Sequence, residues 1–251
     1  KVGPSPIARA ASAVHGNGVL QSLYLLFNEG YKASNGARLV REEICQEAIR
    51  LTGLLAEHPA GNQPKTHALL ALMLLNAARL PARVDGEGNF LRLQEQDRAQ
   101  WDRPVLVRGM LHFSRSAAGD EVTEYHLQAA IAACHCAATD YESTDWRQIL
   151  SLYDHLAKFN DSPVIALNRA VAVANVHGPQ AGLDAVAAIR GVEKLEAYYL
   201  YHAVRGDFEA RQDNLPLAAG HFRRALELAG LQSERIFLLR RLRECQHRLA
   251  A

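Results

Sequence analysis

Cysteine is scarce in this sequence, with four residues in a chain of 251. That density is too low for a disulfide framework and predicts a reduced, cytoplasmic compartment. An excess of one charge is also missing, because 28 lysines and arginines face 27 acids and leave a formal net charge of +1. Such a chain has no overall field to attract nucleic acid or an anionic membrane, so we expect neither direct DNA binding nor membrane binding.

Long apolar runs are absent as well. None reaches the roughly 18 residues that a membrane-spanning helix needs, and no signal peptide is visible. The sequence also lacks a glycine-rich phosphate loop and an H-E-x-x-H motif. We therefore expect a protein that is not an enzyme and that carries no cofactor, no metal and no catalytic residues.

The stretch ACHCAA places Cys134 and Cys136 on either side of His135 and is the nearest approach to a metal motif. Structural zinc sites need four ligands and usually space their cysteines two to four residues apart. Two cysteines one residue apart on a helix also point to different faces. Small buried cysteines are the better interpretation, and a nucleophilic pair of His126 with Cys134 is a minor alternative.

Hydrophobic residues make up 49% of the chain, and their spacing is helical along most of it. Short loops between amphipathic helices predict antiparallel neighbours, hence an all-α fold made of a stack of helical hairpins. The one expected exception is a non-helical insertion near 83–93, where an Asp-Gly turn signal precedes a short piece that could pair as a strand. Helices are expected at about 20–31, 38–57, 66–80, 95–117, 122–138, 144–159, 162–176, 179–190, 195–212, 214–229 and 232–249.

A tetratricopeptide-like superhelix is expected in the C-terminal half. That repeat has a period near 34, and its second helix carries a small residue, an aromatic residue four later and an alanine three after that. Ala218, Phe222 and Ala225 fit this pattern, and Gly206 occupies the small position of the preceding helix. Plain packing of alanine-rich helices is the alternative. Two looser copies lie upstream, at Ala181, Ala185 and Ala188, and at Tyr153 followed by Pro163.

The expected organisation has three parts. Residues 1–17 are small, polar and turn-rich, and they read as a linker from a missing N-terminal segment. Residues 18–121 form an N-terminal helical unit without repeat copies, and 122–251 form the repeats. The two helical parts together make one continuous domain, 18–251.

Several polar residues interrupt apolar helices, and Glu29 in YLLFNEGY is the first of them. The C-terminal end of a helix disfavours a carboxylate, so Glu29 needs a partner. We expect an arginine of QDRAQWDR or Arg169 to supply it, with Gly30 ending the helix. Arg98 and Asp102 have the i,i+4 spacing of a pair on one helix face.

We expect these residues to share a polar seam, which either lines a pocket or fixes how the helices dock. Burying an arginine without a carboxylate is costly, which also calls for such partners. The candidate residues are Asn28, Glu29, Asp97, Arg98, Trp101, Arg103, Gln128, Asn168 and Arg169.

Seven stretches carry a family resemblance: LYLLFNEGYKAS, EAIRLTGLLA, LALMLLNAARLPAR, QDRAQWDR, LQAAIAACHC, TDWRQILSLYDHL and SPVIALNRAVAVA. In this order they resemble the C-terminal extension of a group of extracytoplasmic-function sigma factors of the sigma-70 family. The resemblance runs from about Val19 to Ala251. It implies a bacterial transcription-initiation protein whose polymerase-binding and promoter-binding regions lie upstream of Lys1, and a non-catalytic, regulatory role for the extension.

Four functions compete on this basis. The first is a regulatory, protein-interaction domain whose partners are the sigma core regions of the same chain, RNA polymerase or a regulatory protein. The second is a ligand- or peptide-sensing module with a polar pocket, and the third is a hydrolase using His126 or Cys134. The fourth is nucleic-acid contact through the basic last helix, which carries Arg235, Arg240, Arg241, Arg243 and Arg248.

Overall fold

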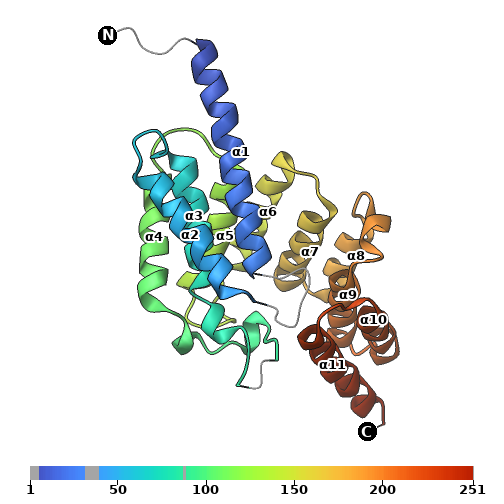
Figure 1. Cartoon of the computed structure of the whole chain (residues 1–251). Coiled ribbons are helices and arrows are strands. Elements are labelled where there is room, and N and C mark those ends of the chain that lie inside the picture. Colours follow the sequence, from blue (N-terminus) through green and yellow to red (C-terminus); the bar gives the residue numbers. More distant parts are fainter. Residues whose placement is uncertain (1–5, 32–39, 87–88, 251) are drawn as a thin grey trace. The chain divides into compact units, whose positions relative to one another are not determined.

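The protein is all-helical in the residues that the structure describes. The computed structural model describes 6–31, 40–86 and 89–250, with side chains from Asn17 onward. Within these ranges the only β contact is a single antiparallel bridge between Val84 and Phe90. The expected all-α fold is confirmed, and the insertion is non-helical but forms no strand (Figure 1). Residues 1–5, 38–39 and 87–88 of the expected segments lie outside the described residues.

Helix ends follow local signals. Proline opens several helices at a position where its missing N–H costs nothing, and Asp102, Asp145 and Ser162 cap helices by accepting backbone N–H groups. The α-helices are α1 (Pro6–Tyr31), α2 (Glu42–Glu57), α3 (Pro64–Ala77), α4 (Arg103–Ser116), α5 (Glu124–Ala137), α6 (Trp146–Phe159), α7 (Pro163–His177), α8 (Pro179–Ala187), α9 (Tyr199–Arg211), α10 (Leu215–Leu228) and α11 (Gln232–Ala250). Short 3-10 turns are η1 (Leu80–Ala82), η2 (Leu93–Glu95), η3 (Arg98–Gln100) and η4 (Val192–Leu195).

The chain forms two compact units that interleave in sequence. Unit 1 comprises Lys1–Leu80 and Trp101–Ala133, and unit 2 comprises Pro81–Gln100 and Cys134–Ala251. The insertion therefore folds with the C-terminal helices. The domain boundary expected at 121/122 stays a prediction.

Unit 1 is built around α3. Every residue from Thr66 to Leu75 is buried, as expected of a helix that is apolar all round. Two glycines allow close approach in this unit, Gly109 between α4 and α3 and Gly30 between α1 and α2. A Cβ at Gly109 of α4 would lie 2.9 Å from Leu75 Cδ2, and a Cβ at Gly30 of α1 would lie 2.7 Å from the backbone nitrogen of Cys45. Gly30 is thus a contact residue within α1, whose described part runs to Tyr31, and its expected role as the helix stop stays a prediction.

Unit 2 contains the expected repeat packing between α9 and α10. Phe222 is 1% exposed and packs with Ala218 and Ala225 in one core cluster. A Cβ at Gly206 would lie 2.9 Å from the Phe222 ring, so the small residue on α9 makes room for the aromatic residue on α10.

The second repeat copy is present on α8, but its buried residues are shifted by one position from the expected ones. Ala188 is exposed, whereas Gly182, Val186 and Ile189 are buried. A Cβ at Gly182 would lie only 2.6 Å from Ala174 Cβ, so this glycine takes the small position. The alanine-rich sequence of α8 contains two adjacent stripes with the same helical spacing. The stripe with the larger side chains, Val186 and Ile189, is the one that forms the core.

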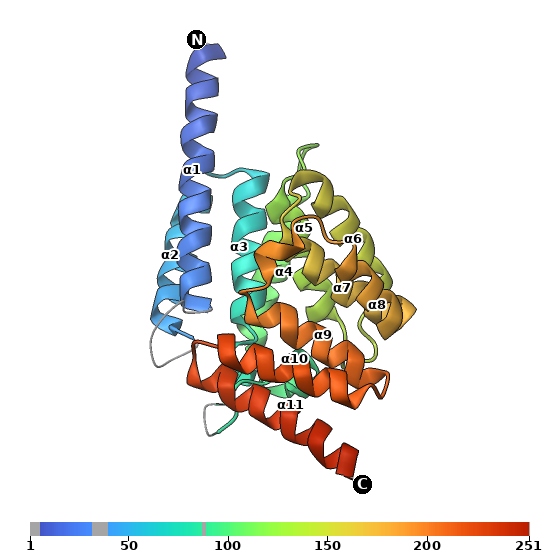
Figure 2. The ribbon, with the colours of Figure 1, turned by 90° about the vertical axis from the view of Figure 1, so that its right-hand side faces the viewer.

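Two hydrogen bonds in unit 2 join residues 34 positions apart. Tyr141 donates its hydroxyl proton to Asn175 on α7, and Arg241 on α11 donates to Asp207 on α9. This separation equals the tetratricopeptide period. The bond between Arg241 and Asp207 fits side-by-side first helices of consecutive hairpins, whereas Tyr141 lies in the loop before α6. Figures 1 and 2 show α9, α10 and α11 stacked side by side.

The helix expected over 95–117 is wrong in its first part. The chain makes the turns η2 and η3, and α4 starts only at Arg103, where Asp102 accepts the N–H of Val105 at 3.0 Å. Pro104 favours a helix start because its ring and missing N–H fit the first turn. Arg98 and Asp102 therefore do not share a helix face.

Candidate functional site: a strap seated on the repeat helices

We call the segment Pro81–Gln100 the strap. Its two ends are held by buried residues, with Ala82 and Arg83 on one side and Gln96 and Arg98 on the other. Between 84 and 95, every residue that the structure describes is half-buried or exposed. The strap is therefore anchored at both ends and lies on the surface of unit 2 in the middle.

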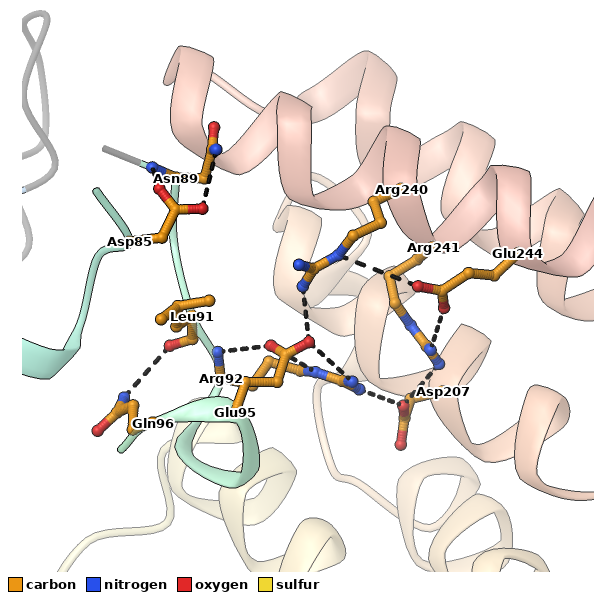
Figure 3. Close-up of polar contacts among 10 residues, drawn as sticks. All are labelled: Asp85, Asn89, Leu91, Arg92, Glu95, Gln96, Asp207, Arg240, Arg241 and Glu244. Carbon is orange, nitrogen blue, oxygen red and sulfur yellow. Dashed lines mark hydrogen bonds and ion pairs between the residues drawn. The ribbon is translucent and has the colours of Figure 1, made fainter. Parts of the chain in front are cut away.

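An ion network joins the strap to the C-terminal helices (Figure 3). Arg92 donates to Asp207 on α9 at 3.1 Å, and Arg241 on α11 donates to the same Oδ1 atom at 3.0 Å. Arg241 also pairs with Glu244 one turn later at 2.7 Å. One carboxylate on α9 thus bridges an arginine of the strap and an arginine of the last helix.

A second carboxylate works from the strap side. Glu95 accepts from Arg240 on α11 at 2.6 Å, and it also accepts the side chain and the backbone N–H of Arg92. Partial burial alone would raise the pKa of Glu95. The hydrogen bonds from Arg92 and the charges of Arg92 and Arg240 outweigh burial and hold that pKa below its usual value. Glu95 is therefore ionised at neutral pH.

Aromatic rings complete the contact. Phe90 of the strap meets Phe237 of α11 edge to face, with ring centroids 5.8 Å apart. The guanidinium groups of Arg92 and Arg240 each lie 5.7 Å from the centre of the Phe237 ring, within cation–π range. We call Asp207, Phe237, Arg240 and Arg241 the strap seat.

Arg98 anchors the C-terminal end of the strap. It is 9% exposed and donates to the carbonyl oxygens of His135 and Ala138 at 2.6 and 2.7 Å. These carbonyls belong to the C-terminal end of α5, where a cation is favourable because the last carbonyls lack helical partners. The hydroxyl of Thr144 accepts a further, longer bond at 3.4 Å.

Beyond the strap, α11 lines an open groove of about 780 Å³. Arg240 and Glu244 belong to both the groove and the ion network, so the two features are continuous. The remaining lining is apolar and basic. It consists of Ile236, Leu239, Arg243, His247 and Arg248.

The other expected seam residues of unit 1 have partners of their own. Glu29 pairs with Arg41 at 2.8 Å, which the sequence argument did not consider. Gln128 accepts a hydrogen bond from Tyr24, and the ring of Trp101 carries Arg79 above it. Asn28 is half-buried and Arg103 is exposed.

In unit 2 the remaining candidates lie at the surface. Asp97 is exposed and accepts the N–H of Ala99, and Asn168 is also exposed. Arg169 has the carboxylate partner that we expected it to need, Asp154 at 2.6 Å, but both side chains are substantially exposed. Arg98 and Asp97 are the two candidates that lie in the strap, and whether the full set lines a binding pocket stays a prediction.

Sequence reasoning missed Arg92, Glu95 and Asp207. Arg92 and Glu95 sit in a stretch that was read as a strand, and Asp207 looks like an ordinary surface acid. One usable signal was present, since Asp207 and Arg241 are 34 residues apart and have opposite charge. Equivalent positions of consecutive repeats lie next to each other, so such a pair is expected to meet.

The ion pair of Glu29 makes a small contribution to stability. Its side chain is 36% exposed and that of Arg41 is 35% exposed, so water screens the pair. We expect Glu29→Lys to lower the free energy of unfolding by at most about 1 kcal/mol, because exposed pairs rarely contribute more. Urea denaturation measures the change, and the Glu29→Lys/Arg41→Glu swap should recover part of it. A loss of several kcal/mol would mean that the carboxylate is buried.

The residues of the hydrolase alternative have structural roles. His126 accepts the backbone N–H of Thr123 at Nδ1, which leaves the proton on Nε2 to donate to the Ser116 carbonyl at 3.2 Å. Burial raises the pKa of the Cys134 thiol, which disfavours the reactive thiolate. Among the described residues, no group of three or more histidines, cysteines or acids is arranged to hold a metal ion.

A histidine pair links α3 and α4 within unit 1. His67 and His112 share a hydrogen bond between their Nδ1 atoms at 3.0 Å, and Nε2 of His67 lies 2.9 Å from the amide oxygen of Asn62. Partial burial, the neighbouring His67 and the charges of Arg115 and Arg108 lower the pKa of His112 to about 4. Partial burial is the larger cause that lowers the pKa of His67, and the charge of Arg115 lowers it further.

These shifts predict acid sensitivity of unit 1. The unfolded chain protonates His112 near pH 6.5 and the folded chain only near pH 4, so folded protein binds fewer protons between these values and loses stability as the pH falls. At pH 5, we expect wild type to lose on the order of 1 kcal/mol more than His112→Asn relative to pH 7, allowing for screening at a half-buried site. Denaturation of both proteins at the two pH values measures the difference, and equal losses would contradict the assignment.

Comparison with known proteins finds relatives without a described activity. The model of a "Family of unknown function (DUF6596)" matches residues 16–117. A protein of Rhizobium meliloti (strain 1021), described as "Uncharacterized protein R00370", is 39% identical over 221 residues, which is 88% of this chain. The chain spans about half the length of that relative, 51%. No solved structure matches the chain, and no helix in the described ranges has the length and apolar character to cross a bilayer.

Proposed function

We propose that this chain is a non-catalytic protein-interaction module that regulates a bacterial sigma factor and acts in the cytoplasm. The proposal has two parts, an interaction half (the chain is a protein-interaction module) and a sigma-factor half (it regulates a sigma factor). The interaction half rests on one observation, which is that the strap contacts α9 and α11 through Arg92, Glu95 and Phe90. Helical-repeat arrays use the faces of their first helices to bind extended segments, and here one segment of the chain occupies such a face. The sigma-factor half rests on the family resemblance of the sequence stretches given above.

The gene provides a first test of the sigma-factor half. The proposal expects the codons before Lys1 to encode the two core sigma regions, and the greater length of the Rhizobium relative is compatible with additional regions. A gene without these regions, in this species and in its relatives, would contradict the proposal.

Transcription provides the second test. We expect the longer sigma protein with this module to differ from a version that ends before it in promoter output with purified core RNA polymerase. The matched control carries Glu227→Ala, a change in an exposed ion pair on α10. Equal output from both versions, with equal binding to the polymerase, would remove the regulatory role.

A further inference from the structure

We infer that the strap seat and the adjoining α11 groove form a binding surface for an extended acidic peptide that carries an aromatic residue, and that the middle of the strap covers part of this surface as an internal competitor. This deepens the interaction half of the proposed function and rests on it. The sigma-factor half is not needed.

The strap shows what chemistry the seat accepts. Phe90 meets Phe237, and Glu95 five residues later meets Arg240. An aromatic ring and a carboxylate at this spacing, on a short segment that ends in the 3-10 turn η2, are a short linear recognition pattern. Any peptide that presents the same two groups finds the same two partners.

The middle of the strap is built to leave the seat without unfolding the unit. Its buried anchors, Arg83 and Gln96, lie outside the part that carries Phe90, Arg92 and Glu95. The ion pairs of that part involve side chains that are 24–41% exposed, so each stabilises the docked state only weakly. A competing peptide therefore has to replace partly exposed ion pairs and the contact between the Phe90 and Phe237 rings.

The groove sets the charge of the competitor. Arg243 and Arg248 lie beyond the seat, Arg248 in an exposed pair with Asp213, and Glu244 is the single acid among the described residues of the groove lining. Added carboxylates on a peptide would meet these arginines, which favours an acidic sequence.

The test uses a fluorescein-labelled peptide with the sequence of residues 89–96, NFLRLQEQ, and fluorescence anisotropy with the whole chain. We expect Phe90→Ala/Glu95→Ala, which weakens the strap alone, to bind the peptide about tenfold more tightly than wild type. A peptide with Gln94→Glu and Gln96→Glu should bind more tightly still. Adding Arg240→Ala should reverse this gain and weaken binding up to about tenfold, and Glu227→Ala should match wild type.

Several results would overturn the inference. They are equal affinity of wild type and the strap variant, no binding by either, or an affinity that Arg240→Ala leaves unchanged. A single-stranded oligonucleotide that displaces the peptide equally well at the same salt concentration would show that this surface binds nucleic acid and not an acidic peptide.

Hydrogen exchange tests displacement without any substitution. The amide of Leu91 donates to the carbonyl of Arg83 at 2.9 Å, so its exchange reports movement of the middle of the strap away from its buried anchor. We expect it to exchange faster than the buried core of α3 and faster again with excess acidic peptide. Exchange only through global unfolding would contradict a displaceable strap, and the result is independent of any polymerase assay.

Discussion

Replacing Arg98 by methionine should lower the free energy of unfolding of unit 2 by about 3 kcal/mol, because it leaves buried carbonyl groups without their charged donor. The guanidinium group is 9% exposed and bonds the His135 and Ala138 carbonyls at the end of α5. Methionine keeps the apolar part of the side chain, so the change isolates the lost hydrogen bonds and charge.

The measurement is urea denaturation followed by tryptophan fluorescence. The chain has two tryptophans, and in a Trp101→Phe background Trp146 reports on unit 2. Trp146 packs against His135, with ring centroids 5.3 Å apart, so it lies beside the altered contact.

Two variants control for charge and shape. Arg169→Met removes an arginine from an exposed pair with Asp154 and should cost less than about 1 kcal/mol. Arg98→Lys should recover only part of the loss, since one ammonium group cannot reproduce the fork that reaches two carbonyls. Equal effects of the methionine substitutions at 98 and 169 would show that the buried contacts of Arg98 do not matter for stability.

Gly182→Ala should destabilise unit 2 by about 2 kcal/mol, because overpacking costs up to about 3 kcal/mol and alanine's helix propensity returns about 1 kcal/mol. The new Cβ would lie 2.6 Å from Ala174 Cβ and 2.8 Å from the Phe208 ring. Ala174 has no rotamer that relieves the clash, so α7 and α8 must separate.

Gly220 is the matched control within the same unit. It also lies inside a helix, but a Cβ there meets nothing within 4 Å. Gly220→Ala should therefore stabilise the protein by about 1 kcal/mol through helix propensity alone. Thermal and urea denaturation of both variants decide the matter, and a stabilising Gly182→Ala would refute the close packing of α7 and α8.

The sequence reveals the contact of Gly182 better than it reveals the contacts of Arg98. The Gly182 contact could be anticipated in kind, because a small residue recurs at the repeat positions, but the alanines around it hid the register by one residue. The competing stripe of Ala181, Ala185 and Ala188 has the same spacing, and only the larger volumes of Val186 and Ile189 decide which stripe is buried. Arg98 could be recognised as an intrusion, but its two short hydrogen bonds go to backbone carbonyls, which leave no trace in side-chain composition.

The sequence by itself determined the helical fold and the repeat that places α9 against α10. These follow from short-range spacing, since the i,i+3 and i,i+4 positions that become buried are adjacent on one helix face. Tertiary structure alone decided where the strap lies and which charges pair across it, as Arg240 with Glu95, 145 residues apart, shows. Each of those side chains has the character of an ordinary solvated surface charge, and partner choice depends on which backbone surfaces meet.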